Sequence, residues 1–230
     1  MKLNKKTVIS LIPKAVLLIL LLVIINTQLT ESVVTGTFEK GLVFSILALG
    51  IFISFRILDI PDLSVDGTFT LGVAVSVMQA FNGDPIKGIL LSIVAGGDNE
   101  YMVRASSINS DRMKIMGFAI ANALVSLSGA MYAQYSSAGD SNSGTGMLVV
   151  GLASIIIGEI FFSKHSILCG ILAAIFGAIA YRFVLAFAMN LGMDSNYTKL
   201  FSACIVALAI SLPAIKKYIT KACKRVCSDK

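Results

Sequence analysis

Eight stretches of apolar residues, separated by short polar segments, run along this chain. They cover approximately residues 15–25, 42–55, 68–81, 86–97, 115–135, 147–162, 167–190 and 200–215. A helix needs about 20 mostly apolar residues to cross the hydrocarbon core of a bilayer, and residues 115–135 meet that length without a charged side chain. The pattern predicts an all-α, polytopic membrane bundle of about eight spans, which forms a single domain over residues 1–230.

Small residues recur four positions apart within several of these stretches. Examples are Ser154 with Gly158 and Ala173 with Gly177. Such spacing lets helix backbones approach closely in lipid, where no hydrophobic force drives helices together. It predicts a compact bundle and does not identify what the bundle transports.

The composition supports a membrane protein and excludes several other classes. Hydrophobic residues make up 56% of the chain, charged residues only 14%, and the mean hydropathy is +0.85. Soluble domains carry about 25% charged residues. The net charge of +6 comes from basic residues at the ends of the apolar stretches, a distribution typical of membrane proteins. A nucleic-acid binder, a disordered chain and a disulfide-stapled scaffold are therefore excluded.

The basic residues also predict the orientation in the membrane. If both termini are cytoplasmic and the eight spans alternate, fifteen Lys and Arg residues fall inside, including the six of the tail 216–230, and three fall outside. This asymmetry agrees with the positive-inside rule. No small-residue cleavage site follows residues 15–25, so we expect that stretch to remain as the first span.

The chain carries no pattern typical of an enzyme. It lacks the Gly-x-x-x-x-Gly-Lys-Ser/Thr phosphate loop, so hydrolysis of ATP by this chain itself is not expected. No pairing of nucleophile and base stands out, and with one histidine the pair Cys223 and Cys227 makes a poor metal site. We predict no catalytic residue, no metal and no cofactor.

A cluster of acids between the second and third stretches is the first candidate for a transport site. Pro61 breaks the helix there, and Asp66 or Gly67 can cap the helix that follows. Broken helices whose free backbone groups face a cavity are frequent in transporters. Asp62, Ser64, Asp66 and Gly67 are therefore candidate pathway residues, and a plain cytoplasmic turn with solvated carboxylates is the alternative.

Two further charges lie within the apolar stretches, where charges are costly and often functional. Glu159 lies near the end of the sixth stretch and is a further candidate pathway residue. At a helical rise of ~1.5 Å per residue, Arg182 lies too deep in the seventh stretch to form an ion pair with Glu159. We expect Glu159 to meet Lys164 or His165 near the inner surface, and Arg182 to snorkel outward.

The polar segment 97–114 is predicted to lie on the cytoplasmic face between two spans. Asp98 or Asn99 can cap a short helix with Glu100 in its first turn, where the helix dipole favours an acid. A short amphipathic helix of this kind can dock into a groove of a soluble partner.

Three blocks of the chain resemble the permeases of ABC importers of the branched-chain amino acid and ribose type. The first block, which runs into residues 115–130, matches the coupling-loop pattern of that family at Gly97, Asn99, Arg104, Ser106, Ile108, Asn109, Arg112 and Lys114, with Ser107 where the family has glycine. Residues 62–72 are similar to its Asp-Leu-Ser-Val segment, and residues 150–158 to its glycine-rich half-helix.

This resemblance implies the partners and the working cycle. A partner ATPase would use ATP and push on the coupling residues Gly97, Asp98, Asn99, Glu100, Arg104, Ser107 and Asn109. A solute-binding protein would deliver a small, amino-acid-like solute outside, and a second copy or a homologous permease would complete the pathway. The implied location is the plasma (inner) membrane of a bacterium.

The resemblance also implies about ten spans, two more than the chain shows. The stretch 86–97 is short and runs directly into the coupling loop, as though part of the fourth span and the next two were missing. We expect such a chain to be poorly stable and to transport little or nothing. Two alternatives to the importer remain open: an ion-coupled secondary transporter, and an inactive truncated remnant.

Overall fold

The computed structural model describes residues 31–97, 112–162 and 166–192, and single residues 197, 200, 203, 204 and 207. All regular secondary structure in these parts is helical. The elements are α2 (Glu31–Phe52), η1 (Ile53–Ile57), α3 (Val65–Phe81), α4 (Pro85–Gly97), α6 (Arg112–Ser136), α7 (Met147–Phe161) and α8 (Ile167–Asn190). The predicted helical class is confirmed.

In the part of the chain that the structure describes, three helices are long and apolar enough to cross a membrane: Glu31–Ile57, Lys114–Ser136 and Ile167–Asn190. Among the described residues, three shorter apolar helices accompany them, namely Val65–Phe81, Pro85–Gly96 and Met147–Phe161. The number of eight spans stays a prediction, because residues 15–25 and most of 200–215 lie outside the described residues.

α2 begins well before the apolar stretch that predicted it. Its first turns are mostly exposed and include the polar residues Glu31, Ser32 and Thr35. The Thr35 hydroxyl donates a hydrogen bond to the Glu31 carbonyl at 3.0 Å. A helix satisfies its backbone groups internally in any solvent, so it continues past the apolar limit.

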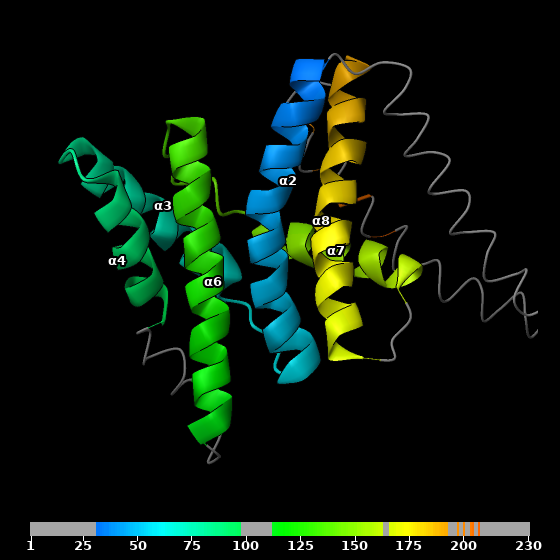
Figure 1. The fold of residues 1–230 in the computed structure, drawn as a ribbon, viewed down its shortest axis with the longest axis horizontal. Helices are drawn as coiled ribbons and strands as arrows, with labels where there is room; N and C mark the ends of the chain where they lie inside the picture. Colours follow the sequence, from blue (N-terminus) through cyan, green and yellow to red (C-terminus); the bar gives the residue numbers. More distant parts are fainter. Residues whose placement is uncertain are drawn as a thin grey trace, which may run out of the picture.

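The described helices pack as two groups of three. α2, α7 and α8 contact one another on one side, and α3, α4 and α6 contact one another on the other side (Figure 1). Contacts between α2 and α6, and fewer between α3 and α7, join the groups. A core of buried residues from both groups, including Phe44, Leu47, Ile51, Phe69 and Val125, fills the junction.

Glycines make the closest helix contacts possible. A Cβ atom built on Gly158 would overlap the Ala173 carbonyl, and one on Gly177 would overlap the Ser154 carbonyl. The predicted close packing at these small residues is confirmed, and it joins α7 to α8.

Three consecutive features interrupt the helical conformation between α2 and α3. The last turn of α2 is the π-helix η1, in which Leu58 N–H donates to the Ile53 carbonyl at 2.9 Å. Asp59 then takes a left-handed conformation with φ 55°, which Asp tolerates better than most residues. Pro61 follows and prevents the helix from resuming at once.

Candidate functional site

The carboxylate of Asp66 ties the start of α3 to the start of α7. Gly146 N–H donates to Asp66 Oδ2 and Leu148 N–H donates to Oδ1, both at 2.9 Å. These amides belong to the first turn of α7, whose N–H groups have no partner within the helix. The negative charge also complements the positive end of the α7 dipole. One side chain therefore caps a helix 80 residues further along the chain.

The loop before α7 is shaped for this contact. Gly146 has φ 85°, a left-handed value that glycine adopts without strain. A Cβ on Gly144 would overlap the Asp66 carbonyl and the Thr70 hydroxyl. Glycine at both positions therefore lets the loop reach the first turn of α3.

Asp62 is buried next to this junction, with 3% of its surface exposed. Its Oδ1 accepts hydrogen bonds from the Ser64 amide at 2.8 Å and from the Ser64 hydroxyl at 2.5 Å. Its Oδ2 is buried and has no hydrogen-bond partner in the described structure. Asp62, Ser64 and Asp66 lie at the interruption between η1 and the first turn of α3, and their role in a transport pathway stays a prediction.

The predicted capping of α3 by Asp66 or Gly67 is wrong. Ser64 occupies the N-cap position without a side-chain capping bond, and Asp66 lies in the first turn with its side chain directed to α7. Gly67 is exposed, and a Cβ there would meet nothing within 4 Å. Packing therefore does not require a glycine at this position.

Glu159 lies near the other end of α7 and pairs with Arg56. Arg56 Nη2 is 2.6 Å from Glu159 Oε2 and 2.5 Å from Oε1. The two side chains border a cavity of about 330 Å³ between α2, α7 and α8. Glu159 therefore does not join the Asp62–Asp66 cluster. Its predicted partners Lys164 and His165 lie outside the described residues, so that contact stays a prediction.

The Arg56–Glu159 pair should stabilise the bundle more than an exposed pair does. The side chains are 43% and 17% exposed, so the pair is only partly screened. We expect a double-mutant cycle of Arg56→Gln and Glu159→Gln to show a coupling energy of about 1–2 kcal/mol, between the values for exposed and buried pairs. Thermal unfolding of the purified protein measures it.

The pair Lys87 and Asp84 provides the control for this cycle. Its atoms are 2.6 Å apart, but the side chains are 67% and 49% exposed. A cycle of Lys87→Gln and Asp84→Asn should give less than about 0.5 kcal/mol. Equal coupling energies for the two pairs would contradict a structural role for Arg56 and Glu159.

Arg182 is directed into the bundle against α2. Its Cζ atom lies 3.4 Å from the centroid of the Phe44 ring, a cation–π contact. The Phe44 ring also contacts Phe69 and Tyr132, with centroids 6.1 and 5.6 Å away. The prediction that Arg182 snorkels outward is wrong, because an aromatic cluster from three helices holds its head group. Arg182 does not pair with Glu159, as expected.

A row of polar side chains on α6 was not singled out in the sequence. Asn122 accepts from the Thr68 hydroxyl at 3.4 Å, and the Ser126 hydroxyl donates to the Ser92 carbonyl at 2.6 Å. Both α6 residues are buried. Polar residues four apart in an otherwise apolar stretch are the signal that identifies such an interhelical face.

The predicted coupling residues lie almost entirely outside the described part of the chain. Gly97 is the last residue of α4, and Asp98, Asn99, Glu100, Arg104, Ser107 and Asn109 fall in the gap before α6. Their role stays a prediction. Among the described residues no group of three or more His, Cys, Asp or Glu side chains could hold a metal ion.

These features define an integral membrane helix bundle with discontinuous helices, an arrangement typical of transport proteins. The chain belongs to the family described as the branched-chain amino acid transport system, permease component, whose pattern matches residues 91–210. This match covers just over half of the chain. The family consists of permeases of ABC-type transporters.

Similar proteins include other permeases. The tyrosine transport system permease protein of Clostridioides difficile (strain R20291) is 27% identical over 261 residues, which cover 75% of this chain and 88% of that protein. The ribose import permease protein RbsC of Escherichia coli (strain K12) is 29% identical over 122 residues, covering 51% of this chain and 36% of that protein. No solved structure matches.

The alignment with the tyrosine permease is longer than this chain. Its 261 positions exceed the 230 residues of the whole chain, although only 75% of the chain takes part. That relative therefore carries residues without a counterpart here. α4 itself has 13 residues, about 20 Å of helix against a hydrocarbon core of about 30 Å.

Proposed function

We propose that this chain is the membrane-spanning subunit of an ABC importer for a small, amino-acid-like solute, and that a partner ATPase drives it. The observation that carries the proposal is the family membership of residues 91–210 together with the similarity to a tyrosine transport permease over 75% of the chain. A solute-binding protein outside the membrane and a second permease subunit complete the proposed assembly.

The discontinuous helices support a transport role. α3 and α7 both begin inside the bundle, and Asp66 joins their first turns. Helix starts of this kind place backbone dipoles within the membrane, where they can act on a passing solute. The two groups of helices meet at this junction.

Uptake by the assembled complex tests the proposal. The chain is reconstituted in proteoliposomes with an ATPase and a solute-binding protein encoded in the same genome, and labelled L-tyrosine is supplied with the binding protein. We expect little uptake compared with that of a longer relative, and we expect the uptake that occurs to require ATP, because α4 is too short to span the core without thinning the bilayer.

Two controls separate the alternatives. An ATPase variant that binds but does not hydrolyse ATP should abolish uptake, and collapse of the proton and sodium gradients should leave it intact. Uptake that follows an ion gradient would instead favour the secondary transporter. No uptake from a complete, folded complex would indicate the inactive remnant.

A second prediction concerns contact with the ATPase. Cysteines placed at Glu100 or Met102 in a chain lacking its native cysteines should crosslink to the ATPase subunit, since the coupling loop is expected to dock there. Cysteines at Ser163 or Ser166, in the predicted turn between the sixth and seventh spans, serve as the comparison. Crosslinks from this turn and none from the loop would reassign the docking element.

A further inference from the structure

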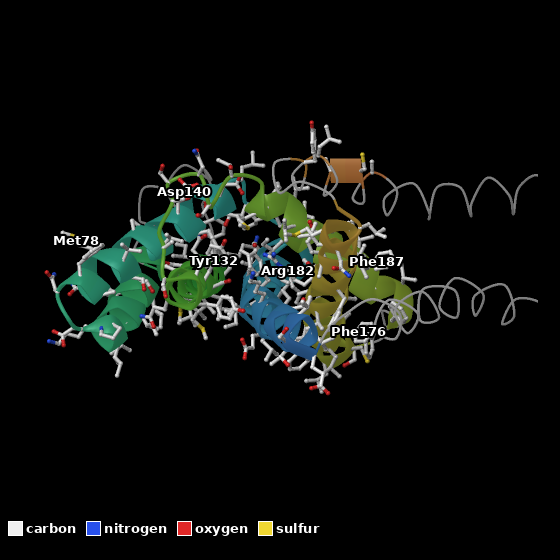
Figure 2. The ribbon with its side chains drawn as sticks, turned by 90° about the horizontal axis from the view of Figure 1, so that it is seen from above. Met78, Tyr132, Asp140, Phe176, Arg182 and Phe187 are labelled. Carbon is white, nitrogen blue, oxygen red and sulfur yellow. The ribbon has the colours of Figure 1, made fainter. Side chains whose placement is uncertain are left out.

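A groove of about 450 Å³ lies between the first half of α2 and the second half of α8. Its lower limit is the contact of Gly41 with Ile179, where a Cβ on the glycine would lie 3.1 Å from the Ile179 backbone. Beyond that contact the helices leave space between them. Figure 2, seen from the end where α2 begins, shows Arg182 between these two helices.

The lining of the groove carries positive charge only. Arg182 and Lys40 both border it, together with the polar side chains of Ser32, Thr37 and Asn190. No acidic side chain lines it in the described part of the chain. A cleft lined by one sign of charge attracts ions of the opposite sign.

The Arg182 guanidinium lacks an acceptor for its buried donor. Its Nε atom is fully buried and has no hydrogen-bond partner among the described residues. No ion pair of Arg182 is present there either, and its guanidinium lies over the Phe44 ring. A buried donor without an acceptor destabilises the fold, and charges within a membrane span are costly and usually functional.

We propose that this groove is an anion-binding site that receives the carboxylate of the transported solute. Arg182 provides the fixed cation, held in place by Phe44, and the exposed Lys40 attracts the solute from outside. In the predicted orientation the groove opens toward the outer face, where a binding protein delivers its solute. The choice of an amino-acid carboxylate rests on the proposed function.

The depth of Arg182 favours a solute over a lipid head group. Eight residues separate Arg182 from the end of α8, which places it about 12 Å below that end. α8 is about 36 Å long for its 24 residues, only slightly more than the hydrocarbon core of about 30 Å. A lipid phosphate at the membrane surface therefore reaches Ser32 near the start of α2, whereas a small carboxylate can reach Arg182 and Lys40, which lie at similar depths.

The charge of the groove can be measured with a cysteine reporter. Ala186→Cys places a thiol in the groove one helical turn from Arg182, in a chain whose native cysteines are replaced by serine. In phosphatidylcholine nanodiscs, its reaction rates with a sulfonate-bearing and a trimethylammonium-bearing methanethiosulfonate are compared and normalised to an exposed cysteine at Asn82.

We expect the groove cysteine to prefer the anionic reagent by about tenfold, the lower end of the effect of clefts of one charge sign. Arg182→Gln should remove most of this preference, and Lys40→Gln, at an exposed position that leaves the fold intact, should reduce it. Lys87→Gln removes a charge outside the groove and should change nothing. L-Tyrosine should slow the labelling, and tyramine, which lacks the carboxylate, should not.

Three results would overturn the inference. These are equal normalised rates for the two reagents, a preference that survives both Arg182→Gln and Lys40→Gln, and protection by phosphatidylglycerol but not by tyrosine. Failure of the proposed function looks different. A complete complex without uptake, in a chain whose groove is still protected by tyrosine, would refute transport and leave the site standing.

Discussion

Replacing Asp66 with alanine is expected to lower the melting temperature of the protein by about 10 °C. The substitution leaves the amides of Gly146 and Leu148 without their acceptor at the start of α7. Hydrogen bonds to a charged group contribute about 1.5–3 kcal/mol each, and two are lost together. Thermal unfolding followed by cysteine accessibility in detergent measures the change, and uptake by the assembled complex should fall with it.

Asp66→Asn should lie between the parent and Asp66→Ala. Its amide oxygen can accept one hydrogen bond, but its NH₂ group then faces the second backbone N–H. Asp59→Asn is the matched control, because Asp59 is exposed and its left-handed conformation suits asparagine equally. A loss of stability in Asp59→Asn as large as in Asp66→Ala would show that the cap is not the cause.

Gly177→Ala is expected to have the second large effect and to prevent α7 and α8 from packing. The new methyl group would overlap the backbone carbonyl of Ser154. Backbone cannot move aside as a flexible side chain can, so the helices must separate along their contact. Overpacking in a core costs about 1–3 kcal/mol and occasionally more, and we expect the upper end or beyond. The yield of monodisperse protein after detergent extraction and its melting temperature measure the loss.

Gly67→Ala provides a control with the same chemical change. Gly67 lies in the first turn of α3, and a Cβ there would meet nothing within 4 Å. Alanine is favoured over glycine within helices by about 1 kcal/mol, so this variant should be as stable as the parent or slightly more so. Equal losses at both positions would mean that helix flexibility, and not close approach, explains Gly177.

Patterns within one helix predicted much of the fold. The predicted apolar stretch at residues 147–162 corresponds to α7 (Met147–Phe161), and the stretch at 167–190 corresponds to α8 (Ile167–Asn190). The start of α2 at Glu31 was not predicted. The hydropathy pattern indicates which residues lie within the lipid, whereas a helix can continue beyond them because its backbone hydrogen bonds do not depend on lipid.

The site was less predictable because its partners are distant in sequence. Asp66 was identified as a cap from its local position, yet its partners Gly146 and Leu148 lie 80 and 82 residues away. Arg182 was noted as a costly charge, but nothing near it in sequence indicates the ring of Phe44 on α2. Sequence alone thus located the charged residues of these sites and could not assign their contacts.

The packing of the described helices into two groups has a mechanical consequence. The groove that contains Arg182 is bordered by α2 and α8, and the cavity at Arg56 and Glu159 by α2, α7 and α8, so both belong to one group. Packed groups of helices rock as rigid bodies in many transporters. If the two groups here do so, the contacts that must change are those between α2 and α6 and the hydrogen bonds that join Asp66 to the start of α7. The walls of both cavities would travel together, and a solute carboxylate held by Arg182 would keep its surroundings throughout the movement.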